Sequence, residues 1–426
     1  MKRIHLLALI CALFTINANA QDSFTEFIRE DTDRAAYVFH NYETFGADIQ
    51  TPAPAGYKPF YISHFGRHGS RYHSSDSYFN KCLPALEAAE KEGLLTVDGK
   101  GLLDRLRTLR ELHEGQFGIL TQLGGQQHKD IAARMYRRFP KVFAQKDRKE
   151  VICVSSTIQR CLQSMANFTS ELSANRPDLD FHFYTGEKYM ERIAHGFSLS
   201  AFEKQVNETR DSLLYARLNP DRLMSLFFND SRKAQEILGD TPQHFLQAVF
   251  NCGAIVQDLD EEVAPIFPFF TTEELSAICY AENSRDYSIW AKSIEFARFN
   301  PQYAGQYLLD HIIECADAAV AGNGVAADLR FGHDSGLAPT FFLMGVDGFD
   351  WEGHIGQSGD HWICGKEMCM ASNIQMIFYR NRKGGILVKI LHNEAETTIK
   401  AVPAFSGPYY KWEDLRAYLV SRLPKD

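Results

Sequence analysis

The sequence predicts an α/β fold: a mainly parallel sheet covered by helices on both faces, with a helical cap inserted into the chain. Two observations support this prediction. Apolar, β-branched runs alternate with stretches of helical periodicity, which is typical of parallel sheets buried on both faces. The middle segment, 187–320, is instead rich in helical patterns and has few strand-like runs. We therefore expect a core made of residues 21–186 and 321–426, and a cap made of residues 187–320.

The first core elements are expected between residues 21 and 140. A lead-in segment, 21–59, ends in closely spaced prolines that favour an extended arm. The apolar run Pro59–Phe65 follows and predicts the first strand. Within Leu120–Phe139, apolar residues stand at positions 131, 135 and 139, and this spacing predicts a helix that Pro140 ends.

Two further strands are expected, each followed by a helix. Val151–Val154 has the β-branched, apolar character of a buried strand, and Ser155–Thr157 then opens a helix. Asp328–Phe331 predicts a third strand, which leads through a turn into a helix over Leu337–Met344. A helix between successive strands favours a parallel arrangement of those strands.

The C-terminal part of the core is expected to be a hairpin and a closing helix. The runs Ile374–Tyr379 and Ile386–Leu391 are separated by a glycine-containing turn, which predicts an antiparallel pair of strands. Trp412–Leu423 has the amphipathic pattern of a helix that packs on a core.

The first twenty residues have the features of an export signal. Lys2 and Arg3 form a basic start, residues 6–16 an apolar stretch, and Ala18–Ala20 a cleavage site of small residues. We therefore expect cleavage after Ala20 and a periplasmic or secreted protein. No later run is apolar enough to span a membrane.

The net charge excludes some classes of partner. The formal charge is −9, and it becomes −11 once Lys2 and Arg3 are removed with the leader. An acidic protein is a poor general binder of nucleic acid or of anionic membranes. An anionic ligand must therefore be attracted by a local basic pocket, and the sequence indicates no obligate protein partner.

Cysteine usage is compatible with export. Eight cysteines remain after the leader, and an even number permits disulfides in an oxidising compartment. Cys364 and Cys369 are near enough in sequence to form one. No CxxC pair occurs, which argues against a zinc site with the usual cysteine spacing, and we expect no metal site.

Polar clusters follow three of the predicted strands at the point where each strand ends. In open α/β sheets, ligands bind outside the carboxyl ends of the strands, where helix N-termini attract anions. The three clusters are therefore expected to converge on one phosphate-binding pocket. Their members are Arg67, His68 and Arg71 after the first strand, Arg160 after the second, and His333 and Asp334 after the third.

These residue types suit phosphoryl transfer. The transferred group carries negative charge on three oxygens, and the guanidinium groups of Arg67, Arg71 and Arg160 are suited to bind them. His333 adds a hydrogen-bond donor, and a neutral His68 is the expected nucleophile. Asp334 is expected to protonate the leaving alkoxide and then to activate water. Two simpler readings remain open: Arg160 as a solvated first-turn residue and Asp334 as a helix N-cap.

The same residues resemble a known family. The motif RHGSR at 67–71, Arg160, and His333-Asp334 occur in the order typical of histidine acid phosphatases, clade 2 of the histidine phosphatase superfamily. The stretches LTQLGGQQH, QRCLQSMANF, LRFGHDSGLAP and ILVKILHNE are most similar to the multiple inositol polyphosphate phosphatases. The resemblance implies a phosphoglycerate-mutase-like core, a phosphohistidine on His68, and no cofactor.

One departure bears on the substrate. Typical multiple inositol polyphosphate phosphatases have His-Ala-Glu at the third cluster, whereas this chain has His333-Asp334-Ser335, as in ordinary acid phosphatases and several phytases. The expected small-molecule substrate is an inositol polyphosphate such as phytate. The alternative is a broad-specificity acid phosphatase for sugar phosphates or nucleotides. A mutase and a non-catalytic phosphate binder are two further alternatives.

Four other residues are weaker candidates for substrate contacts. His73 lies where related sequences often have proline, and it is expected either to contact substrate or to be exposed. Lys188, Arg192 and His195 in the predicted cap either form a basic wall facing additional phosphates or belong to a solvated face.

Overall fold

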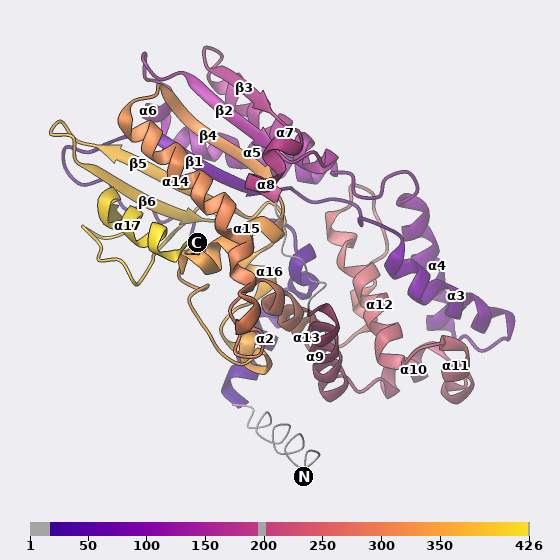
Figure 1. Cartoon of the computed structure of the whole chain (residues 1–426). Coiled ribbons are helices and arrows are strands. Elements are labelled where there is room, and N and C mark those ends of the chain that lie inside the picture. Colours follow the sequence, from indigo (N-terminus) through magenta and orange to yellow (C-terminus); the bar gives the residue numbers. More distant parts are fainter. Residues whose placement is uncertain (1–17, 195–201, 425–426) are drawn as a thin grey trace, which may run out of the picture.

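The computed structural model describes residues 18–194 and 202–424, and it contains one eight-stranded mixed sheet in the order β3-β2-β4-β1-β5-β6-β7, with β8 paired to β6 (Figure 1). The parallel half is formed by β1 (Lys58–Arg67), β2 (Glu150–Ser155), β3 (Asp180–Tyr184) and β4 (Val325–Gly332). The antiparallel half is formed by β5 (Asn373–Arg380), β6 (Ile386–His392), β7 (Ala395–Thr397) and β8 (Tyr409–Lys411). The predicted α/β class is confirmed, with parallel strands confined to one half of the sheet.

The centre of the sheet is where the parallel and antiparallel halves meet. Strand β1 pairs in parallel with β4 on one side and antiparallel with β5 on the other. Every residue of β4 is buried, including Asp328, which accepts from the hydroxyl of Tyr61, and Arg330, which donates to Ser63 Oγ. The predicted strands and the predicted hairpin are all present, and β3, β7 and β8 are strands that the sequence pattern did not indicate.

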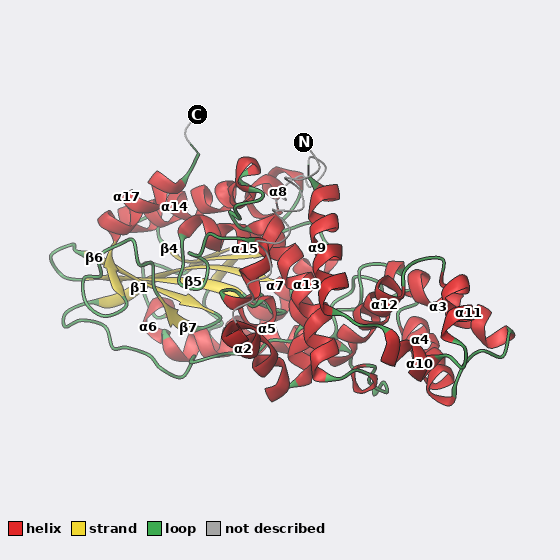
Figure 2. Ribbon diagram, turned by 90° about the horizontal axis from the view of Figure 1, so that it is seen from below, coloured by secondary structure: helices red, strands yellow, loops and turns green. Residues whose placement is uncertain are grey.

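Helices cover both faces of the sheet, as Figure 2 shows. One face is covered by α5 (Gln122–Arg138) and α7 (Gln159–Asn175), which pack against each other and bury residues such as Ile131 and Phe168 with Ile62 of β1. The other face is covered by α14 (Gln306–Ala321), α15 (Asp334–Met344) and α17 (Trp412–Arg422). Helix α15 begins three residues before the predicted Leu337, and Pro339 lies inside it.

A separate group of helices lies away from the sheet, on the right of Figure 1. It consists of α3 (Ser77–Lys91), α4 (Val97–Leu112), α10 (Asp221–Phe227), α11 (Ser231–Leu238) and α12 (Pro242–Ala254). Helix α3 packs against α11 and α12, and α4 packs against α10. Residues 77–112 therefore pack with the predicted cap although they precede it in the chain. Conversely, α14 belongs to the predicted cap by sequence and packs on the sheet. The division at residues 186 and 321 stays a prediction.

The remaining helices pack against one or both of these groups or against one another. Long helix α13 packs against α9, α2 and η8. Short helix α8 packs against β2, β4 and α14. Their bounds are α2 (Ala18–Glu30), η2 (Thr32–Phe39), α6 (Pro140–Phe143), α8 (Glu187–Ala194), α9 (Glu203–Arg217), η4 (Val256–Asp258), η5 (Phe267–Phe269), α13 (Thr272–Trp290), η6 (Ala297–Phe299), η7 (Pro301–Gly305), η8 (Ile355–Asp360) and α16 (Cys364–Glu367).

The lead-in segment differs from the predicted extended arm. Its first half is helical, because Phe24 and Ile28 lie one turn apart on α2 and are buried where that helix packs against α13. Only the part near the prolines is irregular. Residues 1–17 of the predicted leader lie outside the described residues, and the cleavage site after Ala20 falls in the first turn of α2.

Within the described residues, no helix is both long enough and apolar enough to cross a bilayer.

The predicted pairing of Cys364 with Cys369 is wrong, since both are free. Each sulfur instead lies near a different polar partner: Cys364 Sγ is 3.6 Å from Asp286 Oδ2, and Cys369 Sγ is 3.5 Å from Ser372 Oγ. Nearness in sequence does not set the distance between two sulfurs.

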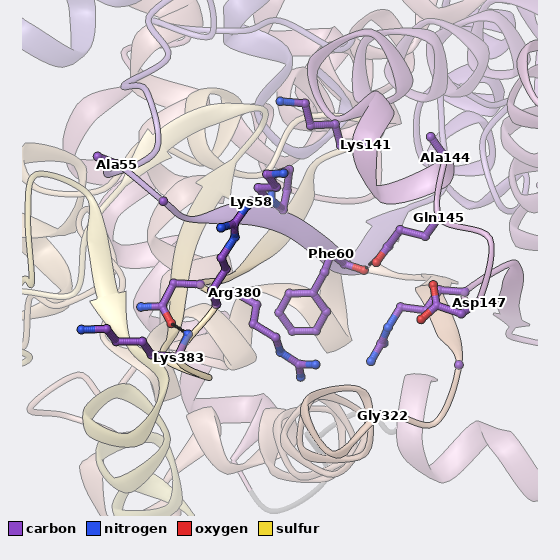
Figure 3. Close-up of a pocket in the computed structure, with 16 residues that line it drawn as sticks. Ala55, Lys58, Phe60, Lys141, Ala144, Gln145, Asp147, Gly322, Arg380 and Lys383 are labelled. Atoms are coloured by element: carbon purple, nitrogen blue, oxygen red, sulfur yellow. Dashed lines mark hydrogen bonds between the residues drawn. The ribbon is translucent and has the colours of Figure 1, made fainter.

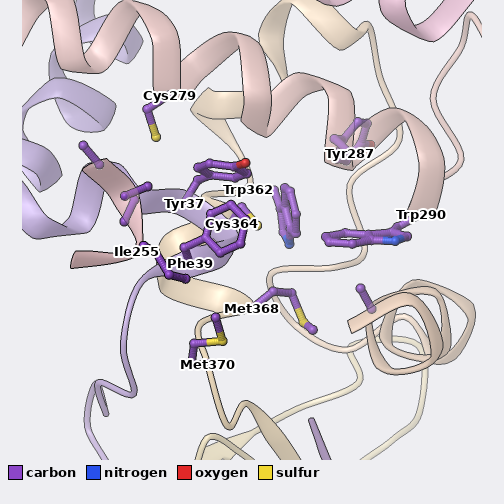
Figure 4. Packing of buried hydrophobic residues seen from close by; sticks show 14 of the residues in the cluster. Tyr37, Phe39, Ile255, Cys279, Tyr287, Trp290, Trp362, Cys364, Met368 and Met370 are labelled. Atoms are coloured by element: carbon purple, nitrogen blue, oxygen red, sulfur yellow. The ribbon is translucent and has the colours of Figure 1, made fainter. Parts of the chain in front are cut away.

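A buried cluster of aromatic and sulfur side chains lies between the helices and the sheet. Figure 4 shows Trp362, Cys364 and Met368 packed close to Tyr37 and Phe39. This packing holds the backbone around residues 38 and 368 in place. Both segments present carbonyl groups to the candidate active site, as described next.

Candidate active site

The three predicted clusters meet at the carboxyl ends of β1, β2 and β4. In the strand register, Arg67 pairs with Gly332, and Ser155 pairs with Phe331. The amide of His68 donates to the carbonyl of Gly332 at 3.0 Å. The polar residues that follow each strand are therefore tied to neighbouring backbone, and the predicted convergence is present.

The loop after β1 lies directly against the start of α5. A Cβ atom at Gly69 would lie 2.4 Å from the carbonyl oxygen of Gly124, which is closer than real Cβ atoms approach. Thr121 donates to the carbonyl of Ser70 through both its amide and its hydroxyl, each at 3.0 Å. The two glycines allow this close approach, which accounts for a glycine in each of the stretches RHGSR and LTQLGGQQH.

His68 is held in a neutral form with one nitrogen free. Its Nδ1 lies 3.0 Å from the carbonyl oxygen of Gly69, and since a carbonyl only accepts, Nδ1 carries the proton. The lone pair is then on Nε2. Burial, reinforced by Arg160, Arg67 and Arg71, lowers the pKa of His68 well below its usual 6.5. The ring is suited to act as a nucleophile even in mild acid.

Arg67 connects the β1 cluster to the β4 cluster. One of its terminal nitrogens donates to the carbonyls of Val38 and Met368, at 2.8 and 2.6 Å. The other lies 2.8 Å from Asp334 Oδ2. The guanidinium is fully buried, so its orientation is fixed by these contacts.

Arg71 and Arg160 complete a group of three cationic side chains. Arg71 donates to the carbonyl of Tyr72 at 2.9 Å, and its guanidinium lies 5.4 Å from the ring centre of Phe39. Burial and the neighbouring Arg160 lower the pKa of Arg71 to about 10. The Nε atoms of both arginines are buried and have no acceptor among the described residues. Donors of this kind favour a bound anion.

His333 lies beside His68, with 5.6 Å between the ring centres. Arg160 lies 3.5 Å from its Nδ1, and since arginine only donates, Nδ1 is the acceptor and Nε2 carries the proton toward Ser156 Oγ at 3.1 Å. Burial and Arg160 lower the pKa of His333 to about 4. Donation from His333 to a phosphate stays a prediction, because Ser156 receives its proton in this arrangement.

Asp334 is the first residue of α15, and the N-cap position belongs to His333. One carboxylate oxygen accepts from the amide of Ser335 at 2.7 Å, and the other faces Arg67. Burial acts to raise the pKa of Asp334, but the charges of Arg67 and Arg71, together with His333 when it is protonated, outweigh it and lower the pKa. The side chain is 24% exposed, so solvent can reach it.

Sequence reasoning missed two residues that hold the loop. Asp258 of η4 accepts from the hydroxyl of Ser70 at 2.5 Å, and Gln127 of α5 donates to the same hydroxyl at 2.8 Å. Gln127 also accepts from the amide of Ser70 at 2.9 Å. Gln127 lies within the LTQLGGQQH stretch, so the sequence contained a signal that could have identified it. Asp258 lies in no motif, and only the fold brings it to the loop.

The weaker candidates are less closely associated with the site. His73 is 1% exposed, and its ring stacks on His113 at 5.3 Å, with Phe39 and Phe79 at its edges, so it is not a surface residue. Arg192 forms an exposed ion pair with Glu314 at 2.9 Å. Lys188 is exposed and lies 5.3 Å from the ring centre of Tyr189. His195 lies outside the described residues. Contacts of these residues with substrate stay predictions.

No group of three or more His, Cys, Asp or Glu side chains is arranged to hold a metal ion within residues 18–194 and 202–424. The functional groups that the site does offer are three guanidiniums, two neutral imidazoles and one carboxyl. This set can bind a phosphate, attack it and protonate a leaving group.

No family model and no curated protein matches the sequence. Solved structures match most of it. The multiple inositol polyphosphate phosphatase of Bifidobacterium longum, in complex with inositol hexasulfate, has a TM-score of 0.75 at 18% identity, covering 91% of this chain and 97% of its own. The phytase from D. castellii has a TM-score of 0.68 at 16% identity, covering 92% and 84%. The Hafnia alvei phytase in its apo form has a TM-score of 0.56 at 11% identity, covering 88% and 98%. The expected fold is thereby confirmed.

Proposed function

We propose that this protein is a phosphomonoester hydrolase that works through a covalent phosphohistidine on His68. The observation that carries the proposal is the state of the His68 ring. Its Nδ1 proton is held by the carbonyl of Gly69, so Nε2 has a lone pair among three arginines. A neutral nitrogen nucleophile inside a cationic pocket suits attack on a phosphate.

The first step is transfer of the phosphoryl group to the protein. Nε2 of His68 forms a bond to phosphorus while the bond from phosphorus to the ester oxygen breaks. The departing alkoxide takes the proton of the Asp334 carboxylic acid and leaves as an alcohol. Arg67, Arg71 and Arg160 neutralise the charge on the three non-bridging oxygens.

The second step returns the protein to its starting state. The Asp334 carboxylate takes a proton from water, and the hydroxide attacks phosphorus. The bond from phosphorus to Nε2 breaks, and inorganic phosphate leaves. One water molecule is consumed, and both side chains regain their original protonation.

Asp334 must be protonated before the first step, and the contact with Arg67 opposes this in the free protein. A phosphate bound by Arg67 would neutralise that charge and raise the carboxyl pKa. Substrate binding and acidic conditions therefore both favour the active form, as expected of an acid phosphatase.

We propose inositol polyphosphates such as phytate as the substrate class. Support comes from the fold shared with proteins named as an inositol polyphosphate phosphatase and as phytases, one of them solved with inositol hexasulfate bound. The alternative is a broad acid phosphatase for sugar phosphates or nucleotides, and the His333-Asp334-Ser335 sequence is compatible with both because ordinary acid phosphatases and several phytases share it.

The test measures phosphate release from phytate, a sugar phosphate, a nucleotide and a simple aryl phosphate. We expect release from all four and the highest kcat/KM with phytate. Isomerised ester without release would indicate a mutase, and unchanged ligand a phosphate binder. A protein denatured in alkali directly after mixing with labelled substrate should carry phosphate that is stable in alkali and labile in acid, and His68→Ala should eliminate this label together with turnover. Appreciable activity in His68→Ala would contradict the assignment of His68 as the nucleophile.

We also propose that the protein is exported after cleavage at Ala20, which places it in the periplasm or outside the cell. The support is the order of a basic start, an apolar stretch and small residues before position 21. N-terminal sequencing of protein recovered from the periplasmic and culture fractions tests it. Full-length protein retained in the cytoplasm would contradict it.

A further inference from the structure

A large basic cavity lies at the end of the sheet opposite to the candidate active site. Its volume is about 1200 Å³, and its walls come from the start of β1, the end of β5, α6 and the loop before β4 (Figure 3). Strands β1 and β4 begin here and end at Arg67 and Gly332. The length of β1 therefore separates the two sites by about 30 Å.

The charges that line this cavity have nearly one sign. It has six cationic side chains and a single carboxylate, Asp147, although the chain as a whole is acidic. A concave surface lined by one sign of charge concentrates the electrostatic field and attracts oppositely charged molecules. The six cations are Lys58, Lys141, Arg148, Arg380, Arg382 and Lys383.

Two of these residues form a rigid floor. The guanidiniums of Arg148 and Arg380 lie 5.1 and 4.4 Å from the ring centre of Phe60. Arg148 donates to the carbonyl of Ala319 at 2.9 Å, and Arg380 donates to the carbonyl of Val320, so both satisfy the last turn of α14. Burial and the proximity of Arg380 lower the pKa of Arg148. The floor is therefore a fixed pair of cations that repel each other.

The other four cations surround this floor. Lys58, Lys141, Arg382 and Lys383 form no ion pair with any described residue. Figure 3 shows Lys58, Lys141 and Lys383 around the same hollow as Phe60 and Arg380. The cavity thus gathers cations that the protein itself leaves unneutralised.

The side chains at the tip of the hairpin are placed by an ordered turn. Asn381 Oδ1 accepts from the amides of Lys383 and Gly385, each at 2.9 Å. The amide of Asn381 donates to the carbonyl of Gly385 at 3.1 Å. Arg382 and Lys383 therefore extend from a defined backbone rather than from a loose loop.

We infer that this cavity is a second anion-binding site, which takes a small molecule carrying several phosphate or sulfate groups. One anionic group cannot neutralise cations that come from β1, α6 and the β5–β6 turn at once, whereas a compact polyanion can. A concave cavity of this size suits a small molecule. The inference is independent of the proposed function, since the two sites share no residue and the second needs no turnover.

Isothermal titration with inositol hexasulfate as the probe tests the inference. Replacing Lys58, Lys141, Arg382 and Lys383 with glutamine removes the outer charges of the cavity. The matched control replaces Lys91, Lys100, Arg232 and Lys233 with glutamine, four exposed cations on the helices away from the sheet. Circular dichroism and thermal melting establish that both variants are folded.

We expect the cavity variant to bind one molecule of inositol hexasulfate fewer than the wild-type protein and the control variant, or to lose at least tenfold in affinity at one site. The same difference between the cavity variant and the control variant is expected when both also carry His68→Ala, because binding in the cavity does not require turnover. Binding of inositol hexasulfate by the cavity variant that equals binding by the wild-type protein would overturn the inference, as would equal losses in the cavity and control variants. Inorganic phosphate that binds the cavity as tightly as the hexasulfate would overturn the requirement for several anionic groups.

Discussion

Asp258 accepts a hydrogen bond from Ser70 at 2.5 Å, and this contact ties η4 to the loop that carries His68 and Arg71. Asp258 is fully buried, and its second carboxylate oxygen has no partner among the described residues. The helical segment around residues 242–258, which lies away from the sheet, therefore positions the nucleophile loop through a single carboxyl group.

Asp258→Asn should change how stability depends on pH. Burial raises the pKa of Asp258 to about 8, whereas an unfolded aspartate ionises near its ordinary 3.8. Between pH 3.8 and pH 8, this carboxyl is protonated in the folded protein and ionised in the unfolded chain, so the unfolded chain binds fewer protons than the folded protein. The free energy of unfolding therefore falls as pH rises, by up to about 1.4 kcal/mol per pH unit. Asparagine lacks this proton. The stability of the wild-type protein relative to Asp258→Asn should therefore fall between pH 5 and pH 8 in urea denaturation.

Asp98→Asn, at an exposed aspartate of α4, serves as the matched control. Its difference from the wild-type protein should be the same at pH 5 and pH 8, because solvent surrounds that carboxylate in both states. A constant difference for Asp258→Asn as well would contradict the buried, protonated state of Asp258.

Asp334→Asn should slow the first chemical step according to the leaving group. An alkoxide needs a proton as it departs, whereas an aryl oxide needs little. We expect a loss of about 10²–10⁴ in phosphorylation by an alkyl ester and a much smaller loss with an aryl ester. Rapid-quench measurement of a single turnover separates this step from hydrolysis of the intermediate. Equal losses with both esters would argue against a proton donor.

His68 should stay neutral throughout the mildly acidic range. Its pKa is held well below 6.5 by burial and by Arg160, Arg67 and Arg71, so its ring should not titrate between pH 8 and pH 5. An ordinary histidine would be about 97% protonated at pH 5. NMR of the protein with isotope-labelled histidine measures this, with His68→Ala to identify the signal. A titration midpoint near 6.5 would contradict the environment described for the ring.

Gly124→Ala should displace the nucleophile loop. A Cβ atom there would lie 2.2 Å from the carbonyl oxygen of Ser70, and backbone on both sides leaves little room to move. We expect a stability loss of about 1–3 kcal/mol together with a lower kcat. Gly101→Ala in α4 is the control, since nothing lies within 4 Å of its Cβ position, and it should stabilise the protein by about 0.5–1 kcal/mol. Unchanged kcat in Gly124→Ala would show that the loop tolerates this displacement.

Much of the core could be predicted because its signals are local. The apolar run before Arg67 and the β-branched run before Ser155 predict strands wherever they pack, and the polar residues after them must then lie at strand ends. The lead-in segment could not be predicted in the same way. Its prolines indicate an extended chain, but burial of Phe24 and Ile28 against α13 decides in favour of helix in its first half.

By itself, the sequence determined the α/β class and most members of the candidate site. A strand pattern and the polar cluster that follows it are formed by consecutive residues, so both can be recognised along the chain. The tertiary structure alone decided which distant side chains complete that site and which charges gather elsewhere. Asp258 reaches Ser70 across 188 residues, and Lys58 lies beside Arg380 only because β1 pairs with β5. Contacts of this kind depend on how helices and strands pack in space, and no spacing along the chain records that packing.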